Sequence, residues 1–270
     1  MGRLDDKVAL ITGAARGTGA AIAQMFADEG ARVVIADVLD ERGKETAEAI
    51  GAAARFRHHD VTSESDWNEA VEEVRAQEGS LDVLVNDAAV LHLSSIDDTT
   101  PETFETVFRV NCLGPFIGTR ACLPLLRDTR GAIVNIGSIN SLFSLPGTVA
   151  YTAAKFGLRG LTKATAVENG KYGVRANIVC PAGGNLEMHG SLVGKPPVAR
   201  TAEEQAMADK AIQAPAPQTP TGIDLTRIAA VALFLATEEA RYCNGAEFVC
   251  DNGMQAGQVI DIPGVWTSAL

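Results

Sequence analysis

Short apolar runs alternate with longer amphipathic stretches along the first 180 residues. The stretches between the runs have helical periodicity, and the runs have the length and near-continuous apolarity of parallel strands covered on both faces. The expected strands are residues 7–12, 32–37, 54–60, 81–86, 131–138 and 174–180. This alternation predicts an α/β fold, a Rossmann-type doubly wound parallel sheet with helices on both faces. Ligands bind such a sheet at the carboxyl ends of its strands.

The pattern changes after Cys180. Residues 182–222 are rich in Pro, Gly and Ala, which is typical of a functional lid or a disordered loop, and we interpret them as a substrate loop. A helix near residues 225–237 and a strand near 246–250 follow, and the apolar tail 254–270 is expected to dock. No second-domain linker is evident, so residues 1–270 are expected to form a single domain.

Composition narrows the classes of partner. The chain of 270 residues has a net charge of −11 and a pI near 4.9, which argues against nucleic acid and anionic membranes as partners. A phosphate-bearing cofactor remains compatible, because backbone amides can hold it. No apolar run reaches the roughly 18 residues of a membrane span, and the start lacks the pattern of a signal peptide. The scattered, odd set of cysteines predicts free thiols in the cytoplasm: Cys112, Cys122, Cys180, Cys243 and Cys250.

A glycine-rich turn joins the first expected strand to the first expected helix. Gly13, Gly17 and Gly19 have the spacing G-x-x-x-G-x-G, which permits a tight turn and close approach of backbone amides to a pyrophosphate. The alternative is an ordinary strand–helix turn. Because the motif directly follows a strand and opens a helix, we predict a dinucleotide site and count Arg16 and Thr18 among its residues.

Asp37 ends the second expected strand. A carboxylate there accepts hydrogen bonds from the adenosine ribose and repels a 2′-phosphate, which favours NAD over NADP. Arg16 favours NADP instead, since its guanidinium could pair with that phosphate. Asp37 is the stronger evidence on cofactor choice, because a carboxylate in contact with the ribose disfavours binding of the 2′-phosphate, whereas an exposed arginine can turn away. Asp60 and Val61 are candidates for holding the adenine ring, with helix capping as the alternative role of Asp60.

Tyr151 and Lys155 lie four residues apart in the segment AYTAAKFGLRG. On a helix they share one face, where an ammonium stabilises a phenolate and lowers the tyrosine pKa from its usual value near 10. Such a tyrosine is a base that works near neutral pH. Taken alone, the segment favours a surface pair on an amphipathic helix.

The motifs together resemble the short-chain dehydrogenase/reductase family over nearly the full chain. They are the glycine turn, Asp37, Asp60, the segment VNDAA, Asn111, Ser138, Tyr151 and Lys155, in this order. The 13-residue step from Ser138 to Tyr151 and the Tyr-x-x-x-Lys step are the spacing of that family. Within the family, the segments VVIADVLDERG, HHDVTSESDW and GAEFVCDNG look most like bacterial NAD-dependent 3α/20β-type hydroxysteroid dehydrogenases. These segments do not form the substrate pocket.

The resemblance implies roles for four catalytic residues. Tyr151 takes or gives the alcohol proton, and Lys155 lowers its pKa and binds the nicotinamide ribose. Ser138 donates a hydrogen bond to the substrate oxygen, and Asn111 holds a water that relays protons through Lys155. The cofactor carries the hydride. Either Ser138 or Asn111, taken by itself, could equally be a turn or cap residue.

Two segments depart from the family pattern. Asn86 and Ala88 are retained as cofactor-binding candidates, but Asp87 adds a negative charge and Ala89 a methyl group near the cofactor.

Near the end of the sixth expected strand, Pro181 and Gly183 are the retained cofactor-binding candidates. The usual threonine is missing there, and we expect Asn185 to replace its hydrogen bond.

The implied activity is an NAD(H)-dependent interconversion of a secondary alcohol and a ketone. Apolar residues of the segment 182–222 suit a cyclic substrate such as a hydroxysteroid. The alternatives are a dehydrogenase of another alicyclic alcohol or a dihydrodiol and, in a different class, a non-catalytic NAD-binding redox sensor. The resemblance also implies a homotetramer, and the His and Cys spacing indicates no metal site. Further pocket-wall candidates are His92, Asn140, Leu142 and Phe143.

Overall fold

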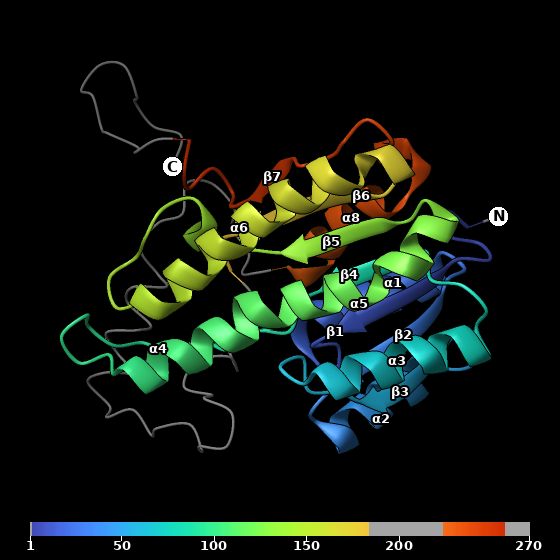
Figure 1. The fold of residues 1–270 in the computed structure, drawn as a ribbon, viewed down its shortest axis with the longest axis horizontal. Helices are drawn as coiled ribbons and strands as arrows, with labels where there is room; N and C mark the ends of the chain where they lie inside the picture. The colour runs from blue at the N-terminus through green and yellow to red at the C-terminus, as the bar shows by residue number, and fades with distance from the viewer. Residues whose placement is uncertain (1, 184–223, 257–270) are drawn as a thin grey trace, which may run out of the picture.

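Seven parallel strands form one sheet in the computed structural model, which describes residues 2–183 and 224–256. The order across the sheet is β3-β2-β1-β4-β5-β6-β7, which confirms the expected doubly wound α/β fold (Figure 1). The predicted substrate loop and C-terminal tail lie almost wholly outside the described residues. The strands are β1 Val8–Thr12, β2 Arg32–Asp37, β3 Ala54–His58, β4 Val83–Asn86, β5 Ala132–Ile136, β6 Arg175–Pro181 and β7 Glu247–Cys250.

Helices cover both faces of the sheet, because side chains along each strand alternate between two apolar clusters. Leu10 belongs to one cluster, whereas its neighbour Ile11 belongs to the other. The Ile11 face is covered by α1 Gly17–Asp28, α2 Asp40–Ile50 and α8 Leu225–Ala236. The Leu10 face is covered by α3 Glu64–Gln77, α4 Pro101–Phe108, α5 Gly114–Thr129 and α6 Val149–Asn169.

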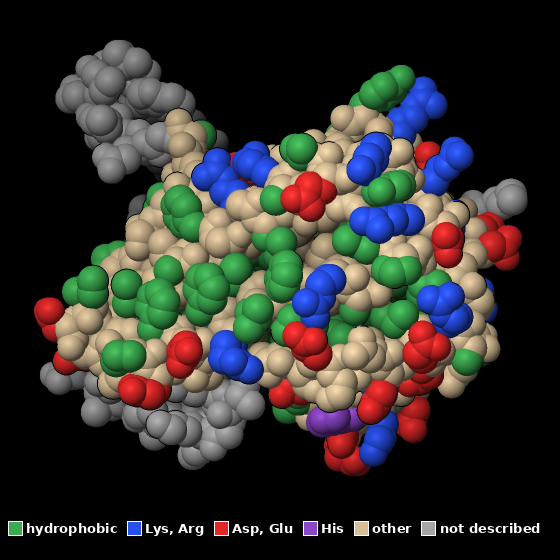
Figure 2. Space-filling view, viewed as in Figure 1, with side chains coloured by type: hydrophobic (Ala, Val, Ile, Leu, Met, Phe, Trp, Pro, Cys, Tyr) green, Lys and Arg blue, Asp and Glu red, His purple; other side chains and the backbone are tan. Residues whose placement is uncertain are grey.

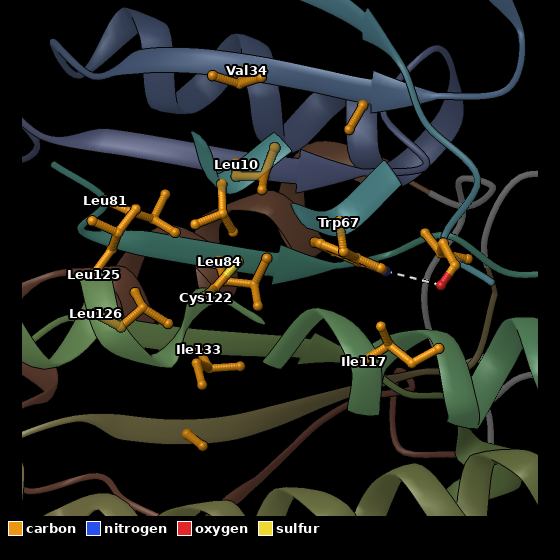
Figure 3. Close-up of a cluster of buried hydrophobic side chains, with 14 of the residues drawn as sticks. Leu10, Val34, Trp67, Leu81, Leu84, Ile117, Cys122, Leu125, Leu126 and Ile133 are labelled. Carbon is orange, nitrogen blue, oxygen red and sulfur yellow. Dashed lines mark hydrogen bonds between the residues drawn. The ribbon is translucent and has the colours of Figure 1, made fainter. Parts of the chain in front are cut away.

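Trp67 of α3 lies in the helical layer that covers the Leu10 face of the sheet. Figure 3 shows its ring among apolar side chains of neighbouring strands and of α5, including Leu84 and Ile117. The indole is fully buried, and its Nε1 donates to the main-chain oxygen of Val61 at 2.9 Å. α5 approaches the ring closely at Gly118, where any Cβ would overlap the indole. This contact fixes α3 against α5 and thereby holds the segment that follows β3.

Two expected elements end differently from the sequence prediction. The third strand stops at His58 instead of residue 60, because Asp60 Oδ1 accepts from Thr62 N at 2.8 Å and turns the chain. The helical stretch between the fourth and fifth expected strands is divided into α4, a π-helical turn Arg109–Leu113, and α5. Pro115 has no N–H to donate to the carbonyl four residues earlier, so the regular α-helical ladder cannot continue there.

None of the helices in the two described stretches combines the length and the apolar composition that a bilayer span requires.

Candidate active site

The predicted site residues gather at the carboxyl edge of the sheet. Thr12, Asp37, Asn86 and Pro181 end β1, β2, β4 and β6, and Ser138 follows the end of β5 by two residues. Parallel strands bring these ends to one edge, where the sequence pattern placed a ligand. Gly183 lies two residues beyond β6 and is partly buried.

The glycine turn between β1 and α1 is close-packed. Gly13 has φ +68°, and a Cβ there would lie 2.6 Å from Cα of Ala88. Gly17 also has a left-handed φ of +62°, which favours glycine. Arg16 takes the N-cap position of α1, and because its guanidinium can only donate hydrogen bonds, it cannot cap the first amides of the helix. Thr18 is buried in the first turn.

Asp37 is held by the backbone on both sides of its carboxylate. One oxygen accepts from Ala15 N at 3.0 Å, within the glycine turn, and the other accepts from Leu39 N at 3.1 Å. The side chain is buried at the end of β2. The carboxylate is therefore fixed beside the predicted phosphate turn, as the ribose hypothesis requires.

Asp60 and Val61 lie at the next strand end. The carboxylate of Asp60 accepts from the amide and the hydroxyl of Thr62, both at 2.8 Å. Ser63, not Asp60, is the N-cap of α3, accepting from Asp66 N at 3.2 Å, so the alternative role of Asp60 as that cap is wrong. Val61 is buried in the core cluster. Their contact with an adenine ring stays a prediction.

The side chain of Asn86 is hydrogen-bonded inside the protein, and its contact with a cofactor stays a prediction. Its amide nitrogen donates to Asn135 Oδ1 at 2.8 Å, and Asn135 Nδ2 donates to Thr162 Oγ1 at 2.8 Å. This buried chain joins β4, β5 and α6. The side chain of Asn86 is consequently turned into the protein and links the three elements, because burial requires its amide to find internal partners.

Asp87 is positioned by Thr12, a residue that the sequence reasoning missed. The hydroxyl of Thr12 accepts from the amides of Asp87 and Ala88, each at 3.2 Å. The carboxylate of Asp87 then accepts from Gly19 N. The signal for Thr12 is a single polar residue at the end of an otherwise apolar strand.

Lys155 reaches back from α6 to the end of β5. Its Nζ donates to the main-chain oxygen of Ile136 at 2.8 Å, and the side chain is 2% exposed. The ammonium lies 5.5 Å from the ring centroid of Tyr151. Burial lowers the pKa of Lys155 to about 8, against the opposing effect of the Asp87 carboxylate. A buried lysine with that pKa remains a cation at neutral pH.

The expectation that the pKa of Tyr151 is lowered is not met in this structure. Burial raises it well above its usual value, and the negative charge of Asp87 acts in the same direction. A hydrogen bond with Ser138 opposes the rise. Desolvation of the phenolate is the largest cause of this rise.

Ser138 is oriented by a compact polar network. Its Oγ accepts from Asn140 N at 3.1 Å, and its own N–H donates to Ser141 Oγ at 3.2 Å. The amide of Asn140 donates to the hydroxyls of Thr148 and Thr152, both at 2.9 Å. Asn140, expected as a pocket wall, therefore ties the turn after β5 to the start of α6, which carries Tyr151.

Asn111 lies in the π-helical turn and is fully buried. Its side-chain oxygen accepts from Val90 N, and its nitrogen donates to Val90 O, both at 2.8 Å. The amide thereby holds the segment after β4 in place. The water relay expected of Asn111 stays a prediction.

An apolar groove of about 650 Å³ opens near this site, between the segments after β4 and β5 and the start of α6. Within the part of the chain that the structure describes, its lining includes Thr152 and Phe156 but neither Ser138 nor Tyr151. Asn185 lies outside the described residues. Over residues 2–183 and 224–256, no group of three or more His, Cys, Asp or Glu side chains could hold a metal ion.

Comparison with known proteins gives concordant matches. A family model described as enoyl-(acyl carrier protein) reductase matches residues 13–255. The chain is 38% identical over 257 residues to the 3-alpha-(or 20-beta)-hydroxysteroid dehydrogenase of Mycobacterium tuberculosis, covering 95% of this chain and 92% of that protein. It is 36% identical over 267 residues to the trans-4-hydroxycyclohexanecarboxylate dehydrogenase of Sinomonas cyclohexanicum, covering 94% and 95%. A crystal structure of a short-chain dehydrogenase/reductase from Burkholderia xenovorans matches with a TM-score of 0.82 and 30% identity, covering 96% of this chain and all of that one.

Proposed function

Because the chain belongs to the short-chain dehydrogenase/reductase family and is an alcohol dehydrogenase of that family, we propose that it interconverts a secondary alcohol and a ketone with NAD(H) as cofactor. The proposed substrate is apolar and cyclic, such as a hydroxysteroid. The observation that carries the proposal is the convergence of Ser138, Tyr151 and Lys155 at the carboxyl edge of β5, beside the glycine turn. This arrangement supports catalysis over a purely sensory role, because a sensor needs the turn but not the hydroxyl pair.

The side chains divide the proton chemistry among them. Ser138 donates a hydrogen bond to the substrate oxygen, where charge develops in the transition state. Tyr151 exchanges a proton with the same oxygen. With its pKa raised, Tyr151 holds its proton at neutral pH and is suited to give it in ketone reduction. Lys155 supplies the positive charge that stabilises the phenolate left behind.

The glycine turn fits a dinucleotide, since Gly13 and Gly19 leave no room for a Cβ and the turn brings backbone amides to the start of α1. When bound, NAD would accept or return the hydride. Asp37 supports NAD rather than NADP, because its carboxylate is fixed beside the turn by Ala15 N and Leu39 N and would repel a 2′-phosphate.

The substrate class is supported by the relatives, which act on a hydroxysteroid and on a hydroxycyclohexane carboxylate according to their names. Both are secondary alcohols of molecules that contain alicyclic rings. A dehydrogenase of another alicyclic alcohol or of a dihydrodiol is the related alternative.

A homotetramer is part of the proposal. Figure 2 shows apolar side chains gathered over the face formed by α4, α5 and α6. Four phenylalanines there are between 36% and 43% exposed, which is unfavourable unless another subunit covers them: Phe104, Phe108, Phe116 and Phe156. All five cysteines are free, which supports a cytoplasmic location.

The test is NADH formation with NAD⁺, and NADPH formation with NADP⁺, across a panel of steroid, alicyclic and linear secondary alcohols. We expect NAD-linked turnover of a cyclic alcohol that is lost in Tyr151→Phe, with the affinity for NADH retained. Turnover of linear alcohols alone would contradict the substrate class. Intact NADH binding without turnover of any alcohol would favour the redox sensor.

A further inference from the structure

The carboxylate of Asp87 caps α1 from outside the helix. It follows β4, receives a hydrogen bond from Gly19 N, and lies so close to Gly19 that a Cβ there would be 2.8 Å from Asp87 Oδ2. The amides of Asp87 and Ala88 are anchored on Thr12 Oγ1 at 3.2 Å, so the carboxyl group cannot easily swing away. A negative group thus already occupies the first turn of the helix that opens the predicted pyrophosphate site.

Two other charges face Asp87 from neighbouring elements. Lys155 on α6 supplies a positive charge, and Asp37 at the end of β2 supplies a negative one. The carboxylate of Asp37 is bound by two amides, whereas that of Asp87 has the Gly19 amide. Burial raises the pKa of Asp87 to about 7, against the lowering effects of Lys155 and the Gly19 amide. The charge of Asp87 therefore changes near neutral pH.

We propose that Asp87 couples dinucleotide binding to proton uptake: docking of the pyrophosphate at the start of α1 favours the protonated carboxyl group, so affinity for the dinucleotide falls as the pH rises through neutrality. This inference rests on the proposed function, because it takes the glycine turn as the pyrophosphate site. The proton comes from solvent, and no covalent step is involved.

The sign of the effect follows from like-charge repulsion. A bound pyrophosphate is negative, so it raises the pKa of a neighbouring carboxyl group and the complex binds more protons than the free protein. If that rise is one pKa unit, the dissociation constant increases about tenfold across the titration. Lys155, whose pKa is about 8, adds a loss of affinity only at higher pH, as its positive charge disappears.

The experiment measures the dissociation constant of NADH between pH 6 and 8 by fluorescence, for the natural chain and for Asp87→Asn. ADP-ribose, which lacks the nicotinamide ring, is titrated calorimetrically in the same series. Asparagine keeps an oxygen that accepts from Gly19 N but cannot titrate. The control is Asp128→Asn, which removes the same charge from an exposed position near the far end of α5.

For a rise of one pKa unit, we expect the dissociation constants of both ligands to increase about fivefold between pH 6 and 8 in the natural chain and in Asp128→Asn, and to stay nearly constant in Asp87→Asn. An unchanged pH dependence in Asp87→Asn would overturn the proposal and assign the effect to another group. Failure of the natural chain to bind NADH at any pH would overturn the proposed function and this inference with it.

A second measurement does not depend on the variant. Calorimetric titration of NADH at pH 7, in two buffers with different ionisation enthalpies, gives the number of protons taken up on binding. A fractional uptake supports the coupling. No uptake, with normal NADH binding, would overturn it while leaving the proposed function intact.

Discussion

The ammonium of Lys155 is attached to the main-chain oxygen of Ile136, at 2.8 Å. The positive charge of the site is thereby fixed to the end of β5, and its position depends on the sheet rather than on the long lysine side chain. Ser138, two residues after Ile136, shares the same support. The distance between cation and hydrogen-bond donor is consequently set by one strand.

Lys155→Met should reduce kcat/KM by at least about 100-fold, because the phenolate of Tyr151 loses its stabilising charge. Steady-state kinetics at pH 7 measures the loss. The matched control is Lys163→Met, which should behave like the natural chain. Lys163 lies about two turns further along α6, and its exposed side chain is paired with Glu247. Equal losses in both variants would mean that α6, rather than the buried ammonium, is being disturbed.

Asp37→Asn should raise kcat/KM with NADP⁺ by about tenfold, equivalent to roughly 1.4 kcal/mol of removed charge repulsion. The ratio of kcat/KM values for NADP⁺ and NAD⁺ is the readout. Asp40→Asn, which removes a neighbouring exposed charge at the start of α2, should leave the ratio unchanged. A ratio that does not move in Asp37→Asn would exclude contact between this carboxylate and the ribose.

His59 should make the fold sensitive to moderate acid. Its ring is buried edge-on against Trp67, neither nitrogen has a hydrogen-bond partner, and burial lowers the pKa from 6.5 to about 4. At this site the unfolded chain binds more protons between these values, so His59 should lower the free energy of unfolding by about 3 kcal/mol as the pH drops from 6.5 to 4. Asp87 acts in the opposite direction over this range, because its raised pKa makes the folded chain bind more protons there, so the effect of His59 is read as a difference between two proteins. Urea unfolding across this range measures the decline.

His59→Phe provides the comparison for that decline. A phenyl ring keeps the contact with Trp67 but cannot take up a proton, so between pH 6.5 and 4 the free energy of unfolding of the natural chain should fall by about 3 kcal/mol relative to that of His59→Phe. An identical slope in both proteins would show that His59 does not cause the acid sensitivity. The lowered pKa of Asp66 acts below its ordinary value of 3.8, outside this window.

Two helical glycines should respond oppositely to alanine. At Gly160 on α6 a Cβ meets nothing within 4 Å, so Gly160→Ala should stabilise the protein by about 0.5–1 kcal/mol. At Gly118 on α5 the added methyl overlaps the Trp67 ring, and the resulting overpacking should cost about 1–3 kcal/mol. Urea unfolding of the two variants measures both changes in the free energy of unfolding. Changes of the same sign would contradict the packing described for α5.

Local patterns were sufficient for the sheet and the cofactor turn. Apolar runs of strand length fixed six strands to within a few residues, and a seventh was placed near residues 246–250, because a parallel strand buried on both faces leaves a continuous signal. Gly13 and Asp37 were found from their positions at strand ends, which depend on neighbouring residues in the chain.

Contacts between residues far apart in the sequence could not be predicted from local patterns. The pairing of Asn86 with Asn135 and the capping of Gly19 by Asp87 join residues that only the folded sheet brings together. The pKa of Tyr151 was predicted in the wrong direction for this structure, since helical spacing places Lys155 nearby but does not reveal how deeply the phenol is buried. Burial is a property of the assembled layers.

The strand order allows the sheet to be assembled as the chain leaves the ribosome. β2 and β3 join one side of β1, and β4, β5, β6 and β7 then join the other side in the order of synthesis. Each new strand therefore pairs with an edge that has already been made, and no formed pair has to open. The last strand, Glu247–Cys250, covers the edge of β6, all of whose residues are buried. A chain that stops before Glu247 would keep that edge open to other nascent chains, and aggregation rather than loss of the catalytic residues would be its main defect.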